Sequence, residues 1–179
     1  NPDVCTRLNF IKYAPKAKWI IMVRDPVESL ESWIYKPFFL NKYTDVVMSI
    51  RTMLFEIDNI AFTNKDAVGL KLEDLKHKPK KTITMLCKWM GIKQEETLYK
   101  MTAQGKRWWG DKSSPITPPF GSIPKLKIGK IFSKNDVFIF NTLFYPFSEK
   151  FGYVEKDFEK FKNDLKIIRP LINQMFDFE

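Results

Sequence analysis

The feature that most constrains this chain is a short apolar run that ends abruptly in three charged or helix-starting residues. The run, Trp19–Val23, is apolar throughout and rich in β-branched residues. Such a run predicts a strand that is buried on both faces, as inside a parallel sheet. Asp25 and Pro26 then match the preferences of a helix N-cap and of the first helical position. Arg24 is therefore expected at the carboxyl end of a strand, where open α/β sheets bind their ligands.

A hydroxyl follows on the predicted helix. Ser32 lies eight residues after Arg24, which places it about two turns into a helix that begins at Pro26. A guanidinium, a helix N-terminus and a hydroxyl can bind one anion together, and a phosphate suits that geometry. The alternative is that Arg24 forms an ordinary surface ion pair at the strand end, and the residue types alone leave both interpretations open.

The segment Ala17–Ser32 resembles the 3′-phosphate-binding segment of sulfotransferases that use 3′-phosphoadenosine 5′-phosphosulfate (PAPS). In that family an Arg after the strand and a Ser eight residues later hold the 3′-phosphate of the donor. The resemblance implies this role for Arg24 and Ser32. It also implies PAPS as the donor, no metal, and transfer of a sulfuryl group to a hydroxyl or amine of a small molecule, a glycan or a protein.

Two later segments resemble the same family. A second predicted strand, Asp66–Leu72, precedes Glu-Asp-Leu and a helix over Pro79–Met90 that stops at Gly91. Leu72 stands where many sulfotransferases carry an aromatic residue near the adenine. Phe151-Gly152-Tyr153 resembles a terminal Phe-Gly-Tyr that is common in the bacterial type.

The least regular stretch of the chain, Gln104–Pro124, combines cations, adjacent tryptophans and glycines. Such a composition suits a bound nucleotide, although a loop pinned to the core by its Trp rings has the same appearance. Sulfotransferases close a late, basic, Gly-containing loop over the donor phosphates. The resemblance extends donor binding to four residues of this stretch: Lys106, Arg107, Trp109 and Gly110.

The remaining patterns predict mainly helices and an α/β fold. Helices are expected over residues 1–14, 44–62, 94–102, 133–152 and 155–168. Pro146 is expected to kink the fourth of these helices, and the last is expected to face inward with Phe158, Phe161, Leu165 and Ile168. Residues 35–43 are expected to form a loop or a helix that is broken at Pro37. The resemblance implies one sulfotransferase-like domain over residues 1–179. It would be a three-layer α/β/α arrangement with a short parallel sheet, P-loop-like, with a helix-rich C-terminal half.

Charge and composition narrow the classes of partner. The chain has 179 residues, a net charge of +9 and 44% hydrophobic residues, which predicts a sizeable core and an anionic ligand. Two cysteines and a single histidine give neither a disulfide framework nor metal-ligand spacing. No apolar run is long enough to span a bilayer, so no membrane segment is expected. No nucleic-acid motif is recognisable, and a nucleic-acid or sulfated-glycan binder therefore ranks last.

The sulfotransferase family has an opening unit with no counterpart before Trp19: a strand, a P-loop-like turn with Lys, and a helix that cradles the 5′-phosphosulfate. The catalytic base also precedes the matching segment, so no catalytic residue is assigned. The chain is expected to be the C-terminal portion of a larger domain, to be complemented by a separate N-terminal segment, or to be an inactive nucleotide-binding or interaction module. The resemblance implies a cytoplasmic location, or the Golgi lumen for a membrane-anchored eukaryotic protein.

Overall fold

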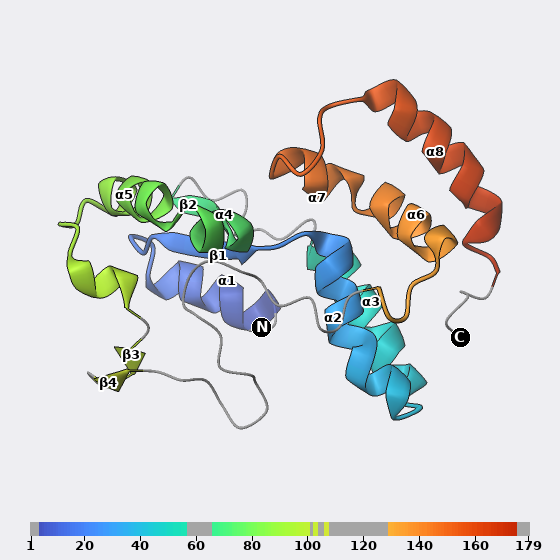
Figure 1. Cartoon of the computed structure of the whole chain (residues 1–179), viewed down its shortest axis with the longest axis horizontal. Helices are drawn as coiled ribbons and strands as arrows, with labels where there is room; N and C mark the ends of the chain where they lie inside the picture. The colour runs from blue at the N-terminus through green and yellow to red at the C-terminus, as the bar shows by residue number, and fades with distance from the viewer. Residues whose placement is uncertain (1–3, 57–65, 101, 104–105, 108–128, 175–179) are drawn as a thin grey trace. The chain divides into compact units, whose positions relative to one another are not determined.

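The computed structural model describes residues 4–56, 66–100, 102–103, 106–107 and 129–174. The chain divides into two compact units, which are described separately (Figure 1). The first unit comprises Asn1–Met22 and Lys65–Lys125, and the second comprises Val23–Asn64 and Leu126–Glu179.

The first unit contains the parallel sheet. Helix α1 (Val4–Tyr13) precedes strand β1 (Trp19–Val23), which pairs with β2 (Ala67–Lys71). The backbone N–H of Trp19 donates to the carbonyl of Asp66 at 2.8 Å, where the two strands begin. Both predicted strands are therefore confirmed. A short two-stranded parallel sheet among many helices is consistent with an α/β fold.

The prediction that Trp19–Val23 is buried on both faces is wrong. Ile20 and Met22 are 42% and 50% exposed, whereas Val23 is buried and the alternate residues are half-buried. One face of the strand, with Trp19, Ile21 and Val23, is therefore more buried than the other. The described part of the sheet has two strands, and within it the other face of β1 remains open.

The rest of the first unit is short helices and a small hairpin. Its elements are α4 (Leu72–His77), α5 (Pro79–Met90), the 3-10 helix η2 (Glu96–Tyr99), β3 (Thr102–Ala103) and β4 (Lys106–Arg107). Helix α5 has the predicted bounds, because Pro79 suits its first turn and Gly91 ends it with a left-handed φ of 73°. The helix expected over residues 94–102 is only the four residues of η2, and α4 was not predicted.

The second unit is entirely helical in its described residues. It consists of α2 (Pro26–Phe39), α3 (Tyr43–Glu56), α6 (Lys134–Leu143), α7 (Tyr145–Lys150) and α8 (Phe158–Leu171). Helices α2 and α3 pack side by side (Figure 1). The core that they form with α6 consists of Val27, Leu30, Ile34, Val46, Phe140 and Phe144.

Two predictions for this unit concern prolines, one at Pro37 and one at Pro146. The break predicted for residues 35–43 is wrong, because α2 continues through Pro37 to Phe39. Pro37 lies in the last turn, where its missing N–H costs a single hydrogen bond, and the chain reverses at Asn41 with a φ of 52°. The kink predicted at Pro146 is confirmed: α6 ends at Leu143 and α7 begins at Tyr145.

Side-chain burial on α8 differs from the prediction. Ile168 is fully buried, but Phe158 is 55% exposed and Leu165 is 38% exposed, so the inward placement of these two residues is wrong. Asp157 caps the helix by accepting from the N–H of Lys160. In the described ranges, no helix is both long and apolar enough to cross a membrane.

Candidate functional site

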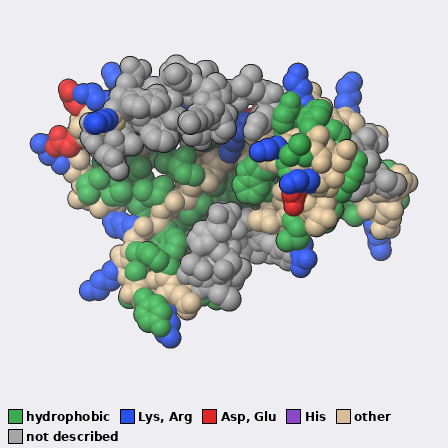
Figure 2. Space-filling model, turned by 90° about the horizontal axis from the view of Figure 1, so that it is seen from below, with side chains coloured by type: hydrophobic (Ala, Val, Ile, Leu, Met, Phe, Trp, Pro, Cys, Tyr) green, Lys and Arg blue, Asp and Glu red, His purple; other side chains and the backbone are tan. Residues whose placement is uncertain are grey.

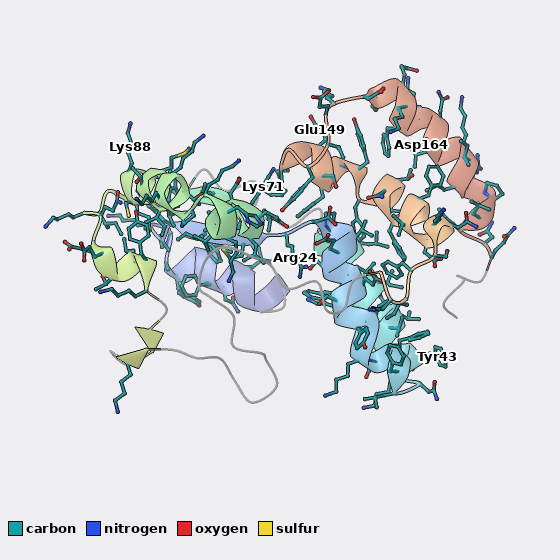
Figure 3. All side chains as sticks on the ribbon, viewed as in Figure 1. Arg24, Tyr43, Lys71, Lys88, Glu149 and Asp164 are labelled. Carbon is teal, nitrogen blue, oxygen red and sulfur yellow. The ribbon has the colours of Figure 1, made fainter. Side chains whose placement is uncertain are left out.

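Arg24 directly follows β1 and precedes the first turn of α2 (Figure 3). Its Nη2 lies 3.3 Å from Oε2 of Glu28, and the two side chains are 19% and 25% exposed. The Nε of Arg24 is buried and has no hydrogen-bond partner among the residues that the structure describes. Because a guanidinium carries five N–H donors, Arg24 retains donor capacity beyond its pair with Glu28.

The start of α2 is capped as expected. The Asp25 carboxylate accepts from the N–H of Glu28 at 2.8 Å, and Pro26 occupies the first turn. This carboxylate already satisfies one of the donors that the helix end offers. The N-terminus of α2 therefore contributes less to anion binding than the sequence indicates, and the cation is the main attractive group.

Ser32 lies on α2 one turn beyond Glu28 and is half-buried. Glu28 and Ser32 are four residues apart on α2 and therefore share one side of the helix, and Arg24, which precedes the helix, contacts Glu28. One such interval spans about 6 Å along the helix axis. All three residues belong to the second unit, and Glu28 links the Arg24 guanidinium to the helix that carries Ser32.

The ion pair of Arg24 with Glu28 bears on the choice between the two interpretations of Arg24, a phosphate-binding residue or a member of an ordinary ion pair. A single 3.3 Å contact between two partly exposed side chains is a weak interaction, typically worth about 0–1 kcal/mol. A phosphate can take two parallel hydrogen bonds from a guanidinium and is the stronger partner. This arrangement can therefore exchange a weak internal pair for a bound dianion.

The sequence did not reveal a buried carboxylate, Glu31, which directly precedes Ser32. Glu31 is 3% exposed and accepts hydrogen bonds from four successive backbone N–H groups of the second unit. The donors are Gly129 at 2.7 Å, Lys130 and Ile131 at 2.8 Å, and Phe132 at 3.1 Å. We call this arrangement the Glu31 clamp. It fixes the segment before α6 to the residue that precedes Ser32.

The charge of Glu31 is stabilised by these contacts. Burial by itself raises the pKa of the Glu31 carboxyl, but the backbone N–H groups of residues 129–132 favour the ionised form. The net result is a pKa below the ordinary value. Glu31 is therefore an ionised, structural carboxylate, and its environment opposes a role as a general acid.

One sequence signal could have identified Glu31. It lies on the apolar face of α2, four residues after Val27 and three before Ile34, both of which are buried. An acidic residue at a core position requires a partner. The partner itself was not predictable, because the donors lie 98 to 101 residues away in the sequence.

The other candidate residues belong to the first unit. Lys106 and Arg107 form β4 in the first unit, paired antiparallel with β3, and Lys106 is exposed. Trp109 and Gly110 lie outside the described residues. Leu72, which stands where an aromatic residue is frequent in sulfotransferases, begins α4.

No set of three His, Cys, Asp or Glu side chains within the described ranges could hold a metal ion. Cys87 is buried on α5, as expected for a small apolar residue. In comparisons with known proteins, the chain matches no family model, no curated protein and no solved structure.

Proposed function

We propose that this chain is a sulfotransferase domain in which Arg24 and Ser32 bind the 3′-phosphate of PAPS. The observation that carries the proposal is the Arg24 guanidinium at the end of a parallel strand, whose buried Nε lacks a partner in the described structure. Ser32 follows on α2, one turn beyond the Glu28 that Arg24 contacts. Cation, strand end and hydroxyl are the features that the sulfotransferase resemblance requires at these positions.

The role of Arg24 and Ser32 in the reaction is orientation. Arg24 before α2 and Ser32 on α2 would together fix the adenosine end of the donor, so that its sulfuryl group points at the acceptor. Correct orientation can account for several kcal/mol of barrier lowering, about 7–11 in the best intramolecular cases. A general base then takes the proton from the acceptor hydroxyl or amine, and a complementing N-terminal segment would supply this base together with the 5′-phosphosulfate site.

The proposal also extends to the architecture of the complete sheet. The two parallel strands and their helices would be part of a three-layer, P-loop-like α/β/α sheet that the complementing segment completes. Lys106, Arg107, Trp109 and Gly110 remain candidates for closing over the donor phosphates.

In a second candidate function, the chain binds the nucleotide but does not catalyse sulfuryl transfer. In that case the chain is a binding module of the same fold, since no catalytic base is assigned within it. Incubation with labelled PAPS and a mixed acceptor pool separates the two, because only the enzyme transfers label to an acceptor. The nucleotide site is common to both functions.

A thermal shift tests the nucleotide site. We expect 3′-phosphoadenosine 5′-phosphate to raise the melting temperature clearly more than adenosine 5′-phosphate at equal concentration. A ligand at a hundred times its dissociation constant adds about 2.7 kcal/mol to stability, which is easily visible. Equal shifts for the two nucleotides would show that no dedicated 3′-phosphate site exists and would contradict the proposal.

A further inference from the structure

The turn between α2 and α3 exposes an unusual number of large apolar side chains. Phe39, Leu40 and Val47 are 59%, 53% and 54% exposed. Together with three neighbours of similar exposure they form what we call the hairpin patch: Trp33, Phe39, Leu40, Tyr43, Val47 and Met48. All six lie in the second unit, and Figure 3 labels Tyr43 where α3 begins.

The hairpin patch is not part of the core. Helices α2 and α3 bury other faces, with Leu30, Ile34 and Val46 pointing into the unit. Phe39, Leu40 and Tyr43 adjoin the reversal at Asn41, where the chain adopts a left-handed φ of 52° and the backbone N–H of Lys42 donates to the Pro37 carbonyl. Trp33 lies further back on α2, and Val47 and Met48 lie on α3. The apolar side chains therefore sit at a projecting turn rather than in a groove.

Cations accompany these apolar side chains. Lys36 and Lys42 are exposed within the hairpin, and Asp45 is the exposed acidic residue between Trp33 and Met48. Figure 2 shows the same mixture on the face that it presents, where Lys and Arg side chains lie beside hydrophobic ones and acidic ones are sparse. The chain as a whole carries a charge of +9.

We propose that the hairpin patch docks this protein onto the surface of an anionic lipid bilayer. Aromatic side chains prefer the headgroup level, where their rings are apolar and their edges are hydrated. Lysines beside them attract anionic lipids, each contributing about 1 kcal/mol near the surface. A projecting turn can enter the interface without a matching groove, and none of the described helices needs to cross the membrane.

Sedimentation with vesicles tests this proposal on the full chain. We expect the protein to bind phosphatidylserine-containing vesicles at low salt and to bind pure phosphatidylcholine vesicles weakly. The double variant F39S/L40S is expected to bind at least about tenfold more weakly, since each residue loses most of its apolar burial. The matched control is Phe158→Ser on α8, which is 55% exposed outside the patch and should leave binding unchanged.

The charge component is tested by the variant K36E/K42E, which should abolish the preference for phosphatidylserine. Because all of these residues are exposed, the variants should keep the melting temperature of the parent chain, which circular dichroism checks. Absence of vesicle binding, or binding that F39S/L40S leaves intact, would overturn the proposal. A wild-type dimer that F39S/L40S dissociates, without vesicle binding, would instead assign the patch to contact between copies.

Discussion

Replacing Glu31 with alanine is expected to lower the free energy of unfolding by about 3 kcal/mol, because four backbone donors lose a charged acceptor at once. The contributions are not additive, since Gly129 and Lys130 are exposed and water can replace part of what they lose. Chemical denaturation measures the change. A loss below about 0.5 kcal/mol, typical of surface substitutions, would show that the Glu31 clamp does not stabilise the fold.

The pH dependence of the free energy of unfolding tests the Glu31 clamp independently. The native pKa of Glu31 is lowered below its ordinary value of 4.5, so its contribution to stability is fully present above that value. This contribution is lost as the pH falls through the native pKa. The stability difference between the parent chain and Glu31→Ala should therefore shrink on acidification. Glu159→Gln on α8, where the exposed carboxylate pairs with Lys162, is the matched control and should be nearly neutral.

Replacing Arg24 with alanine is expected to weaken binding of 3′-phosphoadenosine 5′-phosphate by about 2 kcal/mol or more, roughly a thirtyfold increase in Kd. The reason is the loss of charge-assisted hydrogen bonds to the 3′-phosphate. Calorimetric titration measures it. Ser32→Ala should have a smaller effect in the same direction, because it removes one neutral donor. An unchanged Kd for Arg24→Ala would contradict the assignment.

Glu28 supplies the control that separates a phosphate site from a structural ion pair. If Arg24 serves only its pair with Glu28, then Glu28→Gln and Arg24→Ala should both affect stability slightly and leave nucleotide binding alone. If Arg24 binds the phosphate, Glu28→Gln removes a competing carboxylate and should bind the nucleotide at least as tightly as the parent chain. The two variants then change affinity in opposite directions.

Local signals in the sequence predicted much of the fold. Trp19–Val23 is a strand, Asp25 and Pro26 start the next helix, and Gly91 ends α5. The capping box of Ser133 and Asp136 likewise opens α6 where expected. Each of these features depends on residues within about one helical turn of one another, and such short-range preferences can be read without knowledge of tertiary packing.

The errors come from packing between distant residues. The open face of β1 at Ile20 and Met22 depends on what covers the sheet, which a five-residue run does not encode. The Glu31 clamp joins positions about a hundred residues apart. For the candidate site, the sequence predicted Arg24 at the end of a strand and offered an ion pair as its alternative role, but it did not identify Glu28 as the partner or predict the orphaned Nε.

The most direct test of the nucleotide site is phosphorus magnetic resonance of 3′-phosphoadenosine 5′-phosphate, in which the two phosphates give separate signals. With the parent chain, we expect the 3′-phosphate signal to shift or broaden on binding. With Arg24→Ala at the same protein concentration, that change should largely disappear. A 3′-phosphate signal that never responds, or that responds equally in the two proteins, would contradict the assignment of Arg24.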